Sequence, residues 1–341
     1  MYYNYVFFNT QDNNKRKDNN GYYSICVEDL NKLANVHIVS YPVDYADYFV
    51  RCLFSIHMSP RINKFIRLPF KEKWYPYYFR NPFKNSKPIC FVIASSYITP
   101  QYVSYLRKNY PKCKIVKLHR DLVKVWYKCS PEWNEELANQ LIDVRMSFDA
   151  QEAKKYSWEF FSEFESRIEI PRDSQYPIAD VFFAGKAKDR LPKLMKIYKL
   201  LTGAGLKCEY YLTGVDDKDK EILPGITYSD TFMPYRDMLY KTVNSRIVLE
   251  INQGGAVGYT SRFLEAVMYN KKLVTDNIYI KQSKFYNESN ILCIDNIDEK
   301  IINFIKKEDS EKVFYDYKNE FSPTNLIEQI DSILINRYGD E

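Results

Sequence analysis

The chain has 341 residues, which exceeds one typical domain and suffices for two domains with separate cores. Its formal net charge of +5 is small and dispersed, whereas nucleic-acid-binding proteins concentrate basic residues in a stripe, so no nucleic-acid partner is expected. The 7 cysteines are odd in number and include no CxxC pair, which argues against a disulfide framework or a zinc site and favours a reducing compartment.

The first half of the chain alternates short apolar runs with helical stretches, the pattern of a parallel α/β sheet. Strands are predicted near residues 3–8, 35–40, 89–94, 113–118 and 142–147. The sequence contains no apolar run of about 18 residues and no signal-peptide pattern. We therefore expect a cytoplasmic protein, soluble or peripheral at the inner face of the plasma membrane.

Residues 61–84 combine seven basic residues with one acid and eight aromatic residues, and prolines interrupt them too often for one continuous helix. Cations interleaved with aromatic rings suit the headgroup zone of an anionic membrane, where a lipid-linked acceptor would lie. The alternative is a solvated loop whose aromatic residues pack on the protein. An anionic membrane surface is one predicted partner of this segment.

The first half offers few candidates for a general base, a role that His, Asp and Glu side chains usually fill. His119 and Asp121 follow the strand predicted near 113–118, at the end where open α/β sheets bind ligands. Asp149 follows the next predicted strand and is the second choice. Each of them could instead be a helix cap or a hydrogen-bonded structural residue.

A proline-flanked polar segment at 171–177 is typical of a linker. The predicted division is a first domain over 1–172, a second domain over 173–322, and a C-terminal helix within 323–341 that packs back on the first. The second half is predicted to contain strands at 179–184, 208–213, 226–228, 246–251, 272–275 and 290–294, and helices at 188–202, 235–242, 260–269 and 324–337.

Residues 254–277 are the most informative segment and predict a glycine-rich loop, a helix, a turn and a strand. Thr260 or Ser261 can cap a helix whose first N–H groups lack internal partners, which prepares an anion site. Arg262 adds a cation in the first turn, where the helix dipole disfavours it unless an anion lies between them. Glu265 follows on the same face and could bind ribose hydroxyls. The alternative is an ordinary buried helix after a glycine-rich loop.

Other residues of this half could complete a nucleotide site. The candidates are Gly185, Lys186 and Arg190 for the pyrophosphate, Gly214 and Tyr235 for the base, Gln253 for sugar hydroxyls, and Gly258 for close backbone approach.

Short motifs lie at 180–190 (DVFFAGKAKDR), 211–214 (YLTG), 235–239 (YRDML), 245–250 and 260–266. Together they resemble the donor-binding half of GT-B glycosyltransferases, and are similar to the bacterial enzymes that build capsule or lipopolysaccharide chains. The resemblance implies two Rossmann-like domains that face a cleft, and transfer of a sugar from a nucleotide donor without a bound metal or other cofactor.

Two details bear on that implication. Many retaining members of the family carry a second Glu eight residues before the one that matches Glu265, but this chain has Val257 there, so the resemblance does not imply a retaining outcome. The Asp-x-Asp sequence at 217–219 matches metal-binding motifs of another transferase fold, yet it lies in a charged run typical of a solvated loop. No metal site is predicted.

The predicted function is glycosyl transfer from a nucleotide sugar, with a UDP-sugar favoured, to a glycan or lipid-linked acceptor in surface polysaccharide synthesis. The alternative is a non-catalytic GT-B-like subunit that binds nucleotide sugar or glycan and supports a partner enzyme. A polyol-phosphate transferase is disfavoured, because such enzymes usually have His-rich motifs and this chain has 3 scattered His.

Overall fold

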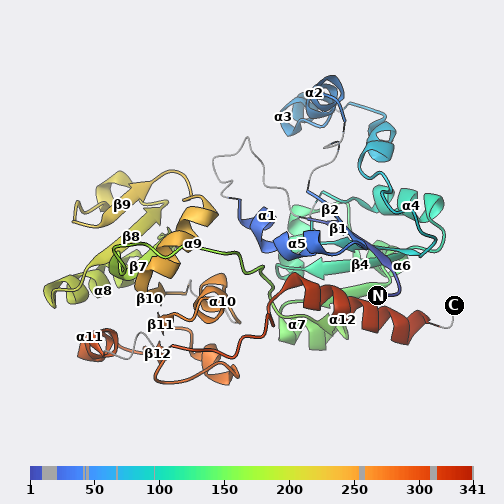
Figure 1. Ribbon diagram of the computed structural model, residues 1–341. Helices are drawn as coiled ribbons and strands as arrows, with labels where there is room; N and C mark the ends of the chain where they lie inside the picture. Colours follow the sequence, from blue (N-terminus) through green and yellow to red (C-terminus); the bar gives the residue numbers. More distant parts are fainter. Residues whose placement is uncertain are drawn as a thin grey trace. The chain divides into compact units, whose positions relative to one another are not determined.

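The computed structural model describes residues 1–9, 21–40, 43, 46–66, 68–95, 97–252, 258–307 and 313–339. The chain forms two compact units, the first comprising residues 1–12, 26–164 and 323–341 and the second residues 13–25 and 165–322. Each unit holds a six-stranded parallel sheet flanked by helices, which confirms the predicted α/β class with two Rossmann-like domains (Figure 1). The division after Phe164 precedes the boundary predicted near residue 172.

The first sheet is formed by β1 (Asn4–Phe8), β2 (Val36–Val39), β3 (Ile89–Ile93), β4 (Lys114–His119), β5 (Val144–Ser147) and β6 (Glu159–Phe160). The second is formed by β7 (Ala179–Lys186), β8 (Cys208–Thr213), β9 (Ile226–Ser229), β10 (Ser245–Glu250), β11 (Lys272–Thr275) and β12 (Ile291–Cys293). Every predicted strand is present within two residues of its predicted bounds. The prediction missed β6, which has only 2 residues.

The helices are α1 (Tyr22–Cys26), α2 (Tyr48–His57), α3 (Pro60–Phe65), α4 (Pro100–Asn109), α5 (Val123–Cys129), α6 (Glu135–Leu141), α7 (Ala150–Tyr156), α8 (Leu191–Gly203), α9 (Tyr235–Asn244), α10 (Ser261–Met268), α11 (Glu299–Lys306) and α12 (Pro323–Tyr338). Short 3-10 helices include η2 (Lys71–Tyr77), η3 (Lys188–Arg190) and η4 (Asp217–Asp219). No helix in the described part of the chain has the length and apolar content needed to span a bilayer.

The first sheet has the strand order β2-β1-β3-β4-β5-β6. Strands β1 and β3 are buried along their whole length, as expected of central parallel strands that have helices on both faces. The C-terminal helix α12 belongs to this unit, because its Asp331 accepts hydrogen bonds from the Tyr2 N–H at 2.9 Å and the Tyr5 hydroxyl at 2.6 Å.

The second sheet has the strand order β12-β11-β10-β7-β8-β9, and all neighbouring strands are parallel. Alternate residues of β7 face opposite sides: Val181 and Phe183 pack in a core with α8 and α11, whereas Phe182 and Ala184 pack with α9. Because helices cover both faces, the carboxyl ends of the strands form the edge at which side chains and loops can build a binding site.

Candidate functional site

Several predicted ligand-binding residues lie at the carboxyl edge of the second sheet. Gly185 and Lys186 are the last residues of β7, Gly214 follows β8, and Gly258 lies between β10 and α10. Ligands of open α/β sheets bind where the chain passes to opposite sides of its first strand, here between β7 and β10. The fold therefore brings these residues to the edge where a ligand is expected.

Helix α10 begins at this edge with a predicted cap. Thr260 is the N-cap, and its hydroxyl accepts a hydrogen bond from the Phe263 N–H at 3.5 Å. Ser261 is the first residue of the helix and is half-buried. Gly258 has φ of +115°, which favours glycine, and its carbonyl accepts a hydrogen bond from the Asn277 amide at 2.8 Å. This helix start is suited to an anion, because its dipole and N–H groups point to the same edge.

A buried carboxylate supports the cap. Glu250, the last residue of β10, is 2% exposed and accepts hydrogen bonds from the hydroxyls of Thr260 and Thr275. Because the Thr260 hydroxyl donates to Glu250, its lone pairs stay available to α10. Burial raises the pKa of Glu250, and the two hydroxyl groups oppose that rise. Sequence analysis missed Glu250; its signal is a single acid that closes an apolar strand.

Arg190 bridges the ends of β7 and β10. Its guanidinium donates to the Lys186 carbonyl at 2.7 and 2.9 Å and to the Ile251 carbonyl. A Cβ atom at Gly185 would lie 3.0 Å from Arg190 Nη2, so glycine leaves room for this side chain. Burial lowers the pKa of Arg190, and the nearby charge of Arg262 lowers it further. Arg190 thus holds the ends of β7 and β10 together and places a positive charge at this edge.

Lys186 and Gly214 are exposed at the same edge. The Lys186 ammonium lies 5.1 Å from the centroid of the Phe232 ring. Gly214 has φ of +66°, so glycine is favoured there for conformational reasons as well as for the close approach that the prediction invoked. A ligand can reach both residues.

Tyr235 and Glu265 were predicted to contact a nucleotide, but both lie in the interior. Tyr235 is 1% exposed and Glu265 is 0% exposed. The Tyr235 hydroxyl lies 2.9 Å from the Glu265 carboxylate and also donates to Glu165, the first residue of the second unit's longer segment. The predicted contacts of Tyr235 with the base and of Glu265 with ribose are therefore corrected, because burial and internal hydrogen bonds remove both groups from the surface.

Arg262 obtains its counter-charge from within the protein. Its guanidinium pairs with Glu265, one turn later in α10, and also contacts Met238 on α9. Burial raises the pKa of Glu265, and the charge of Arg262 opposes that rise. An anion at the helix start is thus not required to explain Arg262, although this side chain remains 15% exposed.

Two of the predicted general bases of the first unit, His119 and Asp149, have contacts that are typical of structural residues. His119 closes β4 but is 2% exposed, and its ring lies 4.7 Å from both Trp126 and Trp158. Burial lowers the pKa of His119 well below its usual range. Its predicted position on an accessible surface is corrected, because the two indole rings enclose it. Asp149 is the N-cap of α7 and accepts a hydrogen bond from the Glu152 N–H at 2.8 Å, which matches the structural alternative.

Asp121 is exposed, and beside it lies a residue that sequence analysis missed. Lys117 is 4% exposed, and its ammonium donates to the Ser95 carbonyl at 3.3 Å. Burial lowers the pKa of Lys117 to about 7, and the charge of Asp121 opposes that fall. Partial desolvation raises the pKa of Asp121. The sequence signal for Lys117 is a lysine inside an apolar strand, on the same face as His119.

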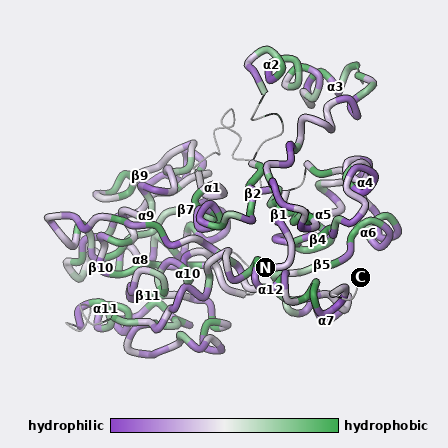
Figure 2. Tube along the Cα trace, turned by 45° about the vertical axis from the view of Figure 1, so that its right-hand side comes forward, coloured by the Kyte–Doolittle hydropathy of each residue, from purple (hydrophilic) through white to green (hydrophobic). Residues whose placement is uncertain are grey.

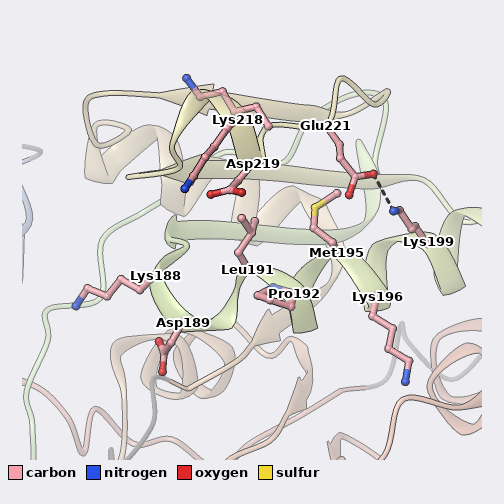
Figure 3. A pocket seen from close by; sticks show the side chains of 11 residues that line it. Lys188, Asp189, Leu191, Pro192, Met195, Lys196, Lys199, Lys218, Asp219 and Glu221 are labelled. Carbon is pink, nitrogen blue, oxygen red and sulfur yellow. Dashed lines mark ion pairs between the residues drawn. The ribbon is translucent and has the colours of Figure 1, made fainter.

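A pocket of ≈ 830 Å³ lies between the start of α8 and the loop that contains η4. Figure 3 shows Lys188 and Asp189 at one end, the Lys199–Glu221 ion pair at the other, and Leu191 and Met195 between them. The ion pair measures 2.7 Å. The pocket thus combines an apolar floor with a rim of both charges.

No family model matches the chain, and no curated protein matches it in sequence. Solved structures do match it. A putative UDP-N-acetylglucosamine 2-epimerase from Listeria monocytogenes has a TM-score of 0.54 at 11% identity, covering 99% of this chain and 98% of that one. Sucrose-phosphate synthase from Thermosynechococcus elongatus has a TM-score of 0.53 at 10% identity, covering 99% of both chains.

The chain has the GT-B fold. The predicted resemblance is thereby confirmed at the level of the fold. TarM is also similar, with a TM-score of 0.49 at 13% identity over 76% of this chain, and this chain spans 57% of the TarM chain. Neighbours with this GT-B fold include a named synthase and a named epimerase, so the fold alone does not select the reaction.

Gln253 and residues 254–257 lie outside the described residues, so the contact of Gln253 with sugar hydroxyls stays a prediction. In the Asp-x-Asp sequence at 217–219, the Asp217 side chain is 96% exposed and pairs with Lys220 at 2.6 Å.

Proposed function

We propose that the chain is a glycosyltransferase that binds a nucleotide-sugar donor, with a UDP-sugar favoured, at the carboxyl edge of the second unit. The observation that carries this proposal is the capped start of α10, which follows Gly258 and lies at the same sheet edge as Arg190 and the exposed Lys186. A helix N-terminus and cationic side chains both favour phosphate groups. The name of one structural neighbour contains a UDP-sugar, which supports the choice of nucleotide.

In this proposal the donor pyrophosphate binds across the first turn of α10, near Lys186 and Arg190. Gly214 admits the base, and Gln253 binds sugar hydroxyls. The acceptor is a glycan or lipid-linked glycan of a surface polysaccharide. Asp121 is the proposed general base, because it is the exposed member of the three candidates near the ends of β4 and β5. The cations of the protein balance the phosphate charge, so no metal is invoked.

The first test is a thermal-shift panel with UDP, GDP, CDP and dTDP, each with and without Mg²⁺. A nucleotide at 100 times its dissociation constant should stabilise the protein by about 2.7 kcal/mol. Lys186→Met should remove the shift, whereas Lys284→Met should retain it, because Lys284 is an exposed lysine that pairs with Glu320 and neither residue is among the predicted site residues. Absence of a shift with every nucleotide would contradict the donor site.

The fully buried Glu265 pairs with Arg262 and is therefore not accessible to the ribose of a donor. This observation favours the alternative, a non-catalytic subunit. The distinguishing measurement is release of nucleoside diphosphate from a nucleotide sugar when an acceptor glycan is supplied. A transferase should release it, and Asp121→Asn should reduce release while the thermal shift persists. A thermal shift without acceptor-dependent release would favour the subunit.

A further inference from the structure

The first unit carries an exposed apolar surface on α2, α3 and the segment that follows α3. Figure 1 and Figure 2 both show α2 and α3 apart from the sheet of that unit. We name this the α2–α3 surface and define it by its exposed apolar side chains: Tyr48, Phe49, Leu53, Ile56, Ile62, Phe65, Ile66 and Phe70.

Helix α2 has two apolar stripes, and only one of them packs on the protein. Phe54 is 5% exposed and lies 5.3 Å from Trp74 and 5.9 Å from Tyr78, measured between ring centroids. Phe49, Leu53 and Ile56 follow the spacing i, i+4, i+7 and therefore form a second stripe on another side of the helix. A helix that is apolar on nearly all sides is typical of a core or a membrane interface, but this stripe faces solvent in the described structure.

The same segment is basic. Residues 48–73 contain Arg51, Arg61, Lys64, Arg67, Lys71 and Lys73 but only one acid, Glu72. Arg51, Arg61 and Lys73 are exposed, and the Lys73 ammonium lies 5.0 Å from the centroid of the exposed Phe70 ring. Aromatic and aliphatic side chains bordered by long cationic ones match the chemistry of an anionic lipid surface, where rings enter the acyl boundary and cations meet headgroups.

We infer that the α2–α3 surface docks the protein on an anionic bilayer, with Phe49, Leu53, Ile56 and Phe65 entering the lipid. This surface extends the predicted membrane segment 61–84 to include α2, which that prediction did not contain. The inference is independent of the donor site, because every residue of the surface belongs to the first unit and the donor-site residues belong to the second.

A second copy of the chain fits this surface less well. A symmetric dimer brings the same patch of both copies together, which would place the basic residues of one copy against those of the other. A bilayer of anionic lipid accepts both the apolar groups and the charges. Self-association is nevertheless an outcome that the experiment must detect.

The experiment is flotation of the full chain with phosphatidylcholine vesicles, with and without phosphatidylglycerol, at low and high salt. We expect binding to the mixed vesicles that weakens with salt. The variant Phe49→Ser/Leu53→Ser/Phe65→Ser should lower the partition coefficient by about tenfold or more. Phe314→Ser is the matched control, because Phe314 is 71% exposed but lies in the second unit.

A second variant separates the charge from the apolar contribution. Arg61→Gln/Lys71→Gln/Lys73→Gln should weaken binding at low salt and reduce the dependence of the remaining binding on salt. No binding to mixed vesicles, or equal binding by the triple serine variant and Phe314→Ser, would overturn the inference. A dimer of the wild type in light scattering that the serine variant abolishes, without vesicle binding, would assign the surface to self-association instead. The nucleotide thermal shift, which depends on the second unit, reports the proposed function separately.

Discussion

The carboxyl edges of the two sheets differ in how their buried polar groups are hydrogen-bonded. In the second unit, Glu250 receives two threonine hydroxyl groups, and Glu265 pairs with Arg262. At the ends of β3 and β4 in the first unit, both ring nitrogens of His119 and the Ser95 hydroxyl are buried without a hydrogen bond within the described structure. We call the second edge organised, although the Thr213 hydroxyl at the end of β8 is also buried without a hydrogen bond within the described residues, and we call the first edge unsatisfied.

A buried polar group without a partner costs about 1–3 kcal/mol, which a hydrogen-bonded one avoids. An organised edge suits a ligand part of fixed geometry, such as a pyrophosphate, because little rearrangement accompanies binding. An unsatisfied edge becomes more stable when a ligand or a rearrangement supplies partners. Under the proposed function, the second unit would recognise the constant part of the donor, and the first unit would contact the variable acceptor.

The largest expected effect comes from breaking a pair in the organised edge. Glu265→Ala should lower the free energy of unfolding by about 3–5 kcal/mol, because it leaves the Arg262 guanidinium beside an empty space in place of its counter-ion. Denaturant unfolding measures this loss. Glu265→Gln is the matched control and should lose less, since its amide still contacts Tyr235 and Arg262. A loss below about 1 kcal/mol for Glu265→Ala would show that this edge is not held by the pair.

At the carboxyl edge of the first sheet, Lys117 should make the free energy of unfolding depend on pH. Because burial lowers the pKa of Lys117 from 10.5 to about 7, the folded chain has lost a proton that the unfolded chain still holds between these values. Stability should therefore rise with pH across this window, by up to about 1.4 kcal/mol per pH unit, and level off below it. Lys117→Met should remove the contribution of this group to the rise.

Lys271 is the matched control for this titration. Burial lowers its pKa to about 7 as well, but it belongs to the second unit. Unfolding monitored at a series of pH values should show that Lys117→Met alters the transition of the first unit and Lys271→Met that of the second. Identical pH profiles for Lys117→Met and wild type would contradict the assignment.

The smallest effects should differ in sign between the two edges. His119→Phe removes two buried nitrogens that lack hydrogen bonds and keeps an aromatic ring between Trp126 and Trp158, so it should stabilise the protein by about 1 kcal/mol. Thr275→Val removes a hydroxyl that donates to buried Glu250 and should destabilise by about 1 kcal/mol. Melting temperatures of both variants measure the contrast. If His119→Phe and Thr275→Val changed the melting temperature in the same direction, the distinction between the two edges would be wrong.

Local features of the second half were predictable because neighbouring residues encode them. The apolar runs of β7, β8, β10 and β11 and the cap residue Thr260 lie within short windows, and the structure confirms them. The missed helix α11 shows the limit of such windows, because its buried residues Ile301 and Ile305 are only one turn apart in a segment with several polar residues.

The fold class, the strands and the helix start that follows Gly258 could be predicted from the sequence, since periodicity and capping act over a few residues. Which polar residues are accessible depends on tertiary packing, which joins elements remote in sequence. Tyr235 is internal and donates its hydroxyl hydrogen bond to Glu165, which lies far away in the chain, and the buried Glu265 pairs with Arg262. Tertiary packing also decided that Phe54 of α2 is covered while Phe49 faces solvent, because covering one stripe of a helix depends on elements remote in sequence.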